Sequence, residues 1–290
     1  MRRLLPLLFL PLLATLPLTA QSLETIDQDY PEALARASTT GKLVFVDFYT
    51  AWCAPCKKLE KLVFQRDSVQ EVLDEHFVLL RYDAENDTTF HLAKKHHVSS
   101  YPTGLILDAE GYVLARKYGF PGDNSRELTA SVLGLTEQAL RRSRGDSVLA
   151  GYSNHIDENG YPQFYIDYVD RTNTRIDSAE FQAYWATERN IFSEEYFSTL
   201  YYFASNDIPA AVGDRFLQYR EVYTTLYGSL DVGIALMFMT FHRFEAAVEA
   251  RNGEAFAQAE TFAREALDAE FAEQVVQRYR GEWSAAAEGK

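Results

Sequence analysis

Apolar and polar positions between residues 28 and 135 switch repeatedly between the period of a strand and the period of a helix. Residues 43–49 and 77–82 are nearly continuous aliphatic and aromatic runs, typical of strands that are buried on both faces of a sheet. Between them, apolar residues at helical spacing predict a helix that starts near residue 53 and a second helix capped by Asp67. A short helix from Tyr30, which ends before Thr39-Thr40-Gly41, precedes the first strand.

The pattern continues with a helix over about 88–97, a strand over 104–107, a turn over 108–111 and a strand over 112–117. Two strands joined by so short a turn must run antiparallel. A helix over 125–133 completes the unit. The fold class predicted for residues 21–140 is therefore α/β, with a mixed central sheet that is covered by helices on both faces.

The character of the chain changes at about residue 141, because apolar and aromatic residues recur at helical spacing from there to the end. Residues 145–290 are predicted to form an all-α domain of unassigned role, including an antiparallel helix pair over 234–250 and 254–267. The aromatic residues of one segment are interpreted as core rather than as a ligand site: Tyr196, Phe197, Tyr201, Tyr202 and Phe203. We expect a fragment from Gln21 to Arg141 to fold by itself.

Composition and charge narrow the function classes. The chain has 28 basic and 42 acidic side chains, which argues against nucleic acid or an anionic membrane surface as a partner. Residues 1–20 have the pattern of an export signal, with two arginines, a short apolar stretch and a possible cleavage site before Gln21. An uncleaved membrane anchor is the alternative, although three prolines interrupt the apolar stretch. No later segment is apolar enough to span a membrane.

The only two cysteines of the chain, Cys53 and Cys56, stand where the first strand gives way to a helix. A cysteine at a helix N-terminus has its thiolate favoured by the exposed backbone N–H groups and the helix dipole, so Cys53 is predicted to be the attacking sulfur. Cys56, one turn further in and more shielded, would resolve the mixed disulfide. The alternatives are a structural staple or half of a zinc site, for which no second cysteine pair is present.

Three separated elements resemble the thioredoxin superfamily, and they agree in order and context. They are Phe45-Val46-Asp47-Phe48, then Trp52-Cys53-Ala54-Pro55-Cys56-Lys57, then Tyr101-Pro102-Thr103. The resemblance covers roughly residues 28–135. The two helical segments over 59–77 are similar to exported thioredoxin-like domains, including the C-terminal domain of the membrane reductant conductor DsbD.

The resemblance implies roles for four further residues. Asp47 matches the family's buried carboxylate and would take the proton from Cys56, while a lone Asp in an apolar strand is in any case costly unless it is used or paired. Tyr101-Pro102 would be a cis peptide bond, with Tyr101 offering its backbone to an extended substrate, although an ordinary trans proline is the alternative. Trp52 would pack as a lid over the site. Leu79 stands where many thioredoxins carry a lysine near the buried acid.

These features predict an exported, periplasmic protein-disulfide reductase that cycles Cys53 and Cys56 through a mixed disulfide. Exported protein thiols and disulfides would be its substrates and a membrane protein its electron donor, with no cofactor or metal besides the redox-active pair. The absence of a histidine between the cysteines favours a reductant. Two alternatives remain: a redox-sensing or partner-binding module whose helical domain is the main functional surface, and a disulfide oxidase or isomerase. His96 and His97 are expected to be solvated at a helix C-terminus.

Overall fold

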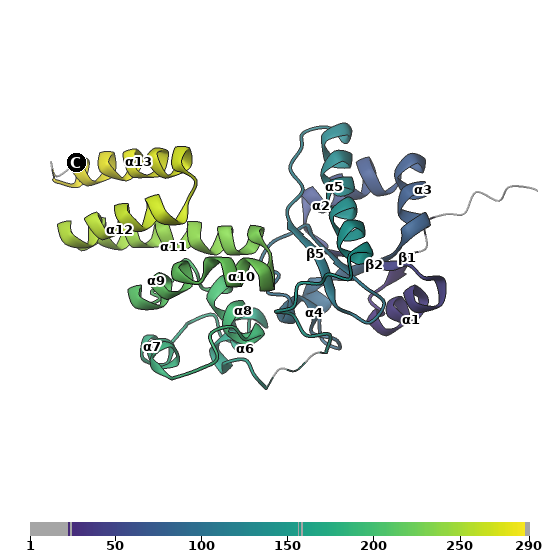
Figure 1. Cartoon of the computed structure of the whole chain (residues 1–290), viewed down its shortest axis with the longest axis horizontal. Coiled ribbons are helices and arrows are strands. Elements are labelled where there is room, and N and C mark those ends of the chain that lie inside the picture. The colour runs from purple at the N-terminus through teal and green to yellow at the C-terminus, as the bar shows by residue number, and fades with distance from the viewer. Residues whose placement is uncertain (1–22, 24, 156, 158, 288–290) are drawn as a thin grey trace, which may run out of the picture.

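The computed structural model describes residues 23, 25–155, 157 and 159–287. The predicted export signal at residues 1–20 lies outside the described residues. Figure 1 shows a sheet with its own helices at one end of the molecule and a helical region beside it that extends away from the sheet. Among the described residues, no helix is long and apolar enough to cross a membrane.

The sheet has five strands in the order β1-β3-β2-β4-β5. Their bounds are Thr25–Asp27 for β1, Leu43–Tyr49 for β2, Phe77–Asp83 for β3, Thr103–Leu107 for β4 and Val113–Tyr118 for β5. Strands β1, β3 and β2 pair in parallel, whereas β4 is antiparallel to both β2 and β5. The mixed sheet and the antiparallel hairpin are confirmed, and β1 is a strand that the sequence pattern did not reveal.

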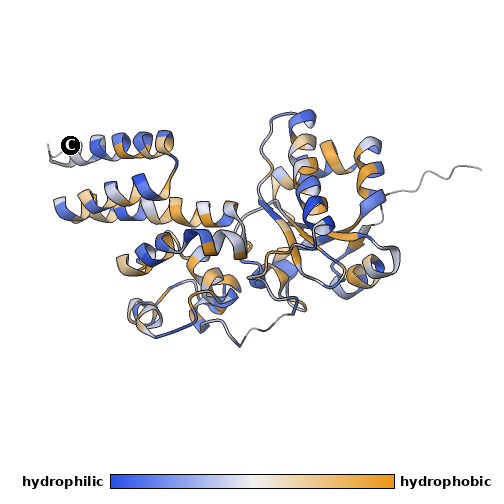
Figure 2. Ribbon diagram, in the orientation of Figure 1, coloured by the Kyte–Doolittle hydropathy of each residue, from blue (hydrophilic) through white to orange (hydrophobic). Residues whose placement is uncertain are grey.

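Side chains of β2 alternate between two hydrophobic clusters, one on each face of the sheet. Val44 and Val46 belong to a cluster that includes Ala33 and Leu92, whereas Phe45 belongs to a cluster that includes Leu73 and Val132. Figure 2 shows hydrophobic colouring along most of the strands, while the helices carry both hydrophobic and hydrophilic residues. Because both faces are covered, β2 can be an almost unbroken apolar run, and one polar residue within it is exceptional.

The helices of the sheet region are α1 (Tyr30–Thr40), α2 (Ala54–Leu59), α3 (Asp67–His76), α4 (Leu92–Lys95) and α5 (Ser125–Arg144). A π-helical turn, η1 (Glu60–Phe64), continues α2, and a 3-10 turn, η2 (Ala84–Asn86), follows β3. Two lengths differ from the sequence prediction: α4 is a single turn within the predicted 88–97 helix, and α5 continues well beyond residue 133. Its apolar positions Leu135 and Ala139 explain the extension, because both are buried against the sheet.

The described residues after 145 form helices and no strand, in agreement with the prediction of an all-helical region. The helices are α6 (Gln163–Val169), α7 (Ser178–Ala186), α8 (Glu194–Tyr202), α9 (Ala210–Gln218), α10 (Arg220–Tyr227), α11 (Ser229–Glu249), α12 (Gly253–Ala266) and α13 (Ala269–Ala287). The pair α11 and α12 confirms the predicted helix pair. In Figure 1, α12 and α13 lie at the end of the molecule away from the sheet.

The helical region and the sheet region share one hydrophobic cluster. Val113 of β5 and Leu105 of β4 belong to the same cluster as Tyr152, Phe197 and Leu236. Four residues of the predicted aromatic core are buried, whereas Tyr202 is only partly so. A chain cut at residue 141 would therefore uncover apolar surface on the sheet side, and independent folding of the fragment up to Arg141 stays a prediction.

Buried charges also join the two regions. Arg116 of β5 donates to Asp231 of α11, and the two residues are only 6% and 2% exposed. Lys95 forms an ion pair with Glu194 of α8, and both residues are buried. A buried charge is costly when it loses its partner, so each pair ties the position of the helical region to that of the sheet.

The two histidines before the cis-proline loop are buried, so the expectation that they are solvated is wrong. His96 and His97 are 1% and 0% exposed. The ring of His97 packs against Tyr201 with 4.4 Å between ring centroids, and its Nε2 lies 3.5 Å from Asp231 Oδ2. Burial, together with the nearby Arg116 guanidinium, lowers the pKa of His97 to about 4. The helical region covers both rings, and this contact leaves no pattern in the sequence around the two histidines.

We predict that Asp231→Asn lowers the free energy of unfolding of the full chain by about 3–5 kcal/mol, because it leaves the buried Arg116 without an anionic partner. The matched control is Asp214→Asn, since Asp214 pairs with Arg243 at 2.8 Å but its side chain is 62% exposed. The control should cost at most about 1 kcal/mol. Urea unfolding measures both, and equal losses would contradict a structural role for the Arg116–Asp231 pair.

Candidate active site

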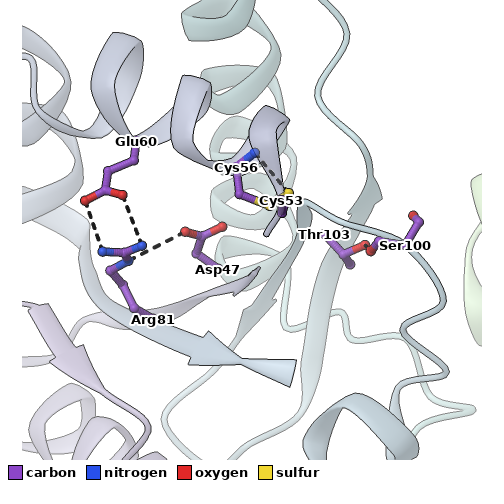
Figure 3. The surroundings of a disulfide bond; sticks show 7 residues. All are labelled: Asp47, Cys53, Cys56, Glu60, Arg81, Ser100 and Thr103. Atoms are coloured by element: carbon purple, nitrogen blue, oxygen red, sulfur yellow. Dashed lines mark hydrogen bonds and ion pairs between the residues drawn. A yellow bond between two sulfur atoms is a disulfide. The ribbon is translucent and has the colours of Figure 1, made fainter. Parts of the chain in front are cut away.

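Cys53 and Cys56 form a disulfide at the point where β2 leads into α2 (Figure 3). Cys53 is the N-cap residue of α2, and its Sγ accepts a hydrogen bond from the backbone N–H of Cys56 at 3.1 Å. Pro55 stands in the first turn, where its missing N–H costs no helical hydrogen bond. In the dithiol state the same N–H groups face the Cys53 sulfur, which stabilises its thiolate.

The two sulfur-bearing residues differ in what they face rather than in how much they are exposed. Cys53 is 1% exposed and Cys56 is 7% exposed, so the expectation that Cys56 is the more shielded is wrong for the disulfide state. Cys53, however, lines a cleft of about 970 Å³, whereas Cys56 is not among the residues that line it. A molecule in this cleft therefore meets Cys53 first.

Asp47 lies in the middle of β2, behind the disulfide, and is 3% exposed (Figure 3). Its Oδ1 has no hydrogen-bond partner among the described residues. Burial raises the pKa of Asp47 to about 7, against the lowering effect of the Arg81 guanidinium. A carboxyl group with a pKa near 7 can both accept and return a proton at neutral pH.

Two charged residues that the sequence analysis did not single out complete the surroundings of Asp47. The Nε of Arg81 lies 4.0 Å from Asp47 Oδ2, and the Arg81 guanidinium also pairs with both oxygens of Glu60 at 3.1 and 3.3 Å. Arg81 lowers the pKa of Asp47 and Glu60 raises it. The parallel register of β2 and β3 places Arg81 directly beside Asp47. Knowledge of this register is the signal that could have identified Arg81 as a site residue.

Arg81 supplies the positive charge that Leu79 does not. Leu79 is 3% exposed and belongs to the same cluster as Phe45, with which it is in register. The resemblance drew attention to position 79 because many thioredoxins carry a lysine there. In this chain the cation is Arg81, two positions after Leu79 in the same strand. Alternate residues of a strand point to the same face of the sheet, so Arg81 lies on the face on which a lysine at position 79 would lie.

The Tyr101–Pro102 peptide bond is cis, as the resemblance implied. Tyr101 lines the cleft beside Cys53, and Pro102 lines a second hollow together with Pro55 of α2. Thr103 begins β4, and its hydroxyl donates to the carbonyl of Ser100 at 2.9 Å, which holds the loop before the proline (Figure 3).

Trp52 does not form a packed lid over the site, because it is 61% exposed. Its indole Nε1 donates to Glu85 Oε1 at 2.8 Å, and its ring meets Tyr101 edge-on at 6.0 Å. These contacts fix the ring at the rim of the cleft. Among the residues that the structure describes, no group of three or more His, Cys, Asp or Glu side chains could hold a metal ion.

The similarity to a known protein family lies in the sheet region. Residues 25–109 match a family model described as thioredoxin-like. The thiol:disulfide interchange protein DsbD of Salmonella typhi is 38% identical over 91 residues, which are 31% of this chain and 16% of that protein. The DsbD of Pseudoalteromonas atlantica is 35% identical over 85 residues, which are 29% of this chain and 14% of that protein.

A solved structure from Bacteroides thetaiotaomicron, described as a putative disulphide-isomerase, is 39% identical. The match covers 39% of this chain and 93% of that one, with a TM-score of 0.34. The chain thus spans almost all of this relative but only about one sixth of the DsbD length, since the Salmonella match covers 16% of that protein.

We predict that Asp47→Asn stabilises the oxidised protein at neutral pH but not in acid. The pKa of the Asp47 carboxyl group is about 7 in the folded protein and near 3.8 in the unfolded chain. As pH rises, the unfolded chain therefore loses the Asp47 proton before the folded protein does. The wild type should therefore lose stability relative to the variant between about pH 4 and 7, reaching on the order of 4 kcal/mol above pH 7.

Urea unfolding at a series of pH values measures this difference. Asp123→Asn is the control, because Asp123 is exposed and its substitution should leave the pH dependence unchanged. A difference between Asp47→Asn and the wild type that stays constant from pH 4 to 8 would contradict the raised pKa of Asp47.

Proposed function

The chain belongs to the thioredoxin superfamily through its N-terminal domain, and from this premise we propose that it is an exported, periplasmic protein-disulfide reductase. The observation that carries the proposal is the geometry of one site: Cys53 caps α2 and faces a cleft, while Asp47 lies buried behind the pair. A structural staple needs neither the cleft nor a buried carboxyl group with a pKa near 7.

The reaction begins at Cys53. Its thiolate attacks one sulfur of a substrate disulfide, so that a mixed disulfide forms and the other substrate sulfur leaves as a thiolate. Cys56 then attacks the Cys53 sulfur, which forms the Cys53–Cys56 disulfide and releases the second substrate thiolate. Two electrons pass to the substrate, and the chain is left in the oxidised state that the structure holds.

Asp47 serves the second step. The Cys56 thiol must lose its proton before it can attack, and Asp47 is the buried carboxylate that we assign as the acceptor. Arg81 and Glu60 set the proton affinity of the Asp47 carboxylate, because Arg81 lowers its pKa and Glu60 raises it. Trp52 and Tyr101 line the cleft in which we place the substrate, and the cis Pro102 lies beside the active-site helix.

The direction of electron flow and the cellular setting rest on other features. Ala54 and Pro55 stand between the cysteines, and neither can stabilise the Cys53 thiolate through a charged side chain. An unusually stabilised thiolate is what makes an oxidant, so this dipeptide favours a reductant. The similarity to part of DsbD and the signal-like residues 1–20 support exported protein disulfides as substrates and a membrane dithiol as the donor that restores Cys53 and Cys56.

We predict that Cys53→Ser abolishes reduction of insulin disulfides by the purified full chain with dithiothreitol as donor, because no attacking sulfur remains. Cys56→Ser, reduced beforehand and freed of dithiothreitol, should instead accumulate a mixed disulfide with insulin, because neither a resolving sulfur nor a donor thiol is left to cleave it. Mass spectrometry of the acid-quenched reaction measures the adduct at Cys53.

Thr50→Ser, a change near the pair that leaves both sulfurs in place, is the control and should turn over normally. Normal turnover by Cys56→Ser, or an adduct that forms at Cys56 in the Cys53→Ser protein, would show that the assigned roles are wrong.

A further inference from the structure

The cleft in front of Cys53 has two walls, and the second comes from the helical region. Residues of the sheet region line one side, namely Trp52, Cys53 and Tyr101, and residues of α6 and the loop after it line the other, namely Tyr168, Arg171 and Thr174. Without the helical region this side of the site would be open. The cleft volume of about 970 Å³ is at the upper end of the range of pockets that hold organic ligands.

Contacts at the base of α6 hold this second wall in place. Tyr165 of α6 donates its hydroxyl to the carbonyl of Lys94 at 2.6 Å. The ammonium group of Lys94 pairs with Asp170 at 2.8 Å, and the Lys94 side chain is only 3% exposed. Both contacts join the end of α6 to α4, just ahead of the Tyr101–Pro102 loop, so the wall keeps a fixed distance from Cys53.

A second link crosses the cleft rim. Arg171 turns the chain after α6 with a φ of 57°, and its Nη1 lies 3.5 Å from Glu85 Oε1. The same Glu85 oxygen accepts the hydrogen bond from Trp52. Arg171 is 66% exposed, so the pair adds little stability, but it joins the helical wall to the ring at the rim.

The walls are aromatic more than charged. Trp52 and Tyr101 meet edge-on on one side, and Tyr168 and Tyr202 meet edge-on at 5.8 Å on the other. Aromatic side chains bury apolar and aromatic groups of a ligand. Of the three carboxylates that line the cleft, Glu85 pairs with Arg171 and Asp170 pairs with Lys94. The third, Asp87, accepts hydrogen bonds from the Tyr82 hydroxyl and from backbone N–H groups of α4.

We propose that residues 168–174 form a substrate-binding wall, which holds an extended polypeptide segment with apolar residues next to its disulfide-bonded cysteine against the Cys53 sulfur. This inference rests on the proposed reductase function. It assigns to the helical region a specificity-determining part of the site, with Thr174 as a wall residue that faces the substrate segment. A small disulfide that reaches Cys53 without filling the cleft does not need the wall.

The test compares Thr174→Trp with Arg175→Trp in the full chain. Thr174 lines the cleft and is exposed, whereas its exposed neighbour Arg175 does not line it, so the two variants place the same indole side chain at adjacent positions of one loop. Two substrates are used: an unstructured apolar peptide whose single cysteine is blocked by glutathione, and bis(2-hydroxyethyl) disulfide. Thr174→Val, which keeps the size of the side chain, is the conservative variant.

We expect Thr174→Trp to raise KM for the peptide at least about tenfold with little change in kcat, because it removes binding shared by ground state and transition state. Its rate with the small disulfide should fall far less than its rate with the peptide, and Thr174→Val should raise KM for the peptide much less than Thr174→Trp does. Arg175→Trp, which lies outside the cleft lining, should match the wild type on both substrates. An unchanged KM for the peptide, or an equal loss on both substrates, would overturn the wall. A wild type that reduces neither substrate would instead overturn the proposed function.

Discussion

The end of a buried strand next to the start of a helix is the constraint on which the site depends. Strand β2 is apolar on both faces and is held between β3 and β4, so the chain leaves the sheet at a fixed point. Cys53 comes directly after that point and caps α2, where backbone N–H groups are unpaired. The position of Cys53, which we propose as the attacking residue, therefore follows from the packing of the sheet. Its disulfide with Cys56 is possible because the two residues are one helical turn apart.

Burial of Asp47 in β2 has a cost in free energy when its carboxyl group is ionised. A carboxyl group in the middle of a buried strand is disfavoured when ionised, and its pKa of about 7 expresses that cost. Arg81 reduces the penalty without removing it, because Glu60 shares the guanidinium and keeps it 4.0 Å from Asp47. The carboxyl group that we propose as the proton acceptor for Cys56 thus has a pKa near neutral pH.

Residues 43–117 could be predicted well from sequence because strand and helix periods there agree with local turn chemistry. The sequence did not reveal β1, whose three residues are too short to show a period, nor the length of α5. Arg81 was missed because its relation to Asp47 depends on the register between strands. The burial of the two histidines was missed because it depends on residues far along the chain: Tyr152 packs against His96, and Ser198 lies beside His97. Contacts between distant segments leave no local pattern.

The helical region was predicted as a separate domain, and its local sequence led to no assignment of chemistry. Its relation to the site comes from packing, since Tyr168 and Thr174 reach the cleft only because buried pairs such as Lys95–Glu194 fix the region against the sheet. A fold that places one wall of a site on each of two regions gains selectivity that the thiol chemistry alone does not provide.

The reduction potential of the Cys53–Cys56 pair in the full chain tests the central claim most directly. It is measured by equilibration with glutathione buffers or with a dithiol of known potential, followed by alkylation of free thiols. A reductase of this fold should have a potential near that of thioredoxin, about −270 mV. A value near about −120 mV, typical of the strongest oxidants built on the same fold, would contradict the assignment as a reductase.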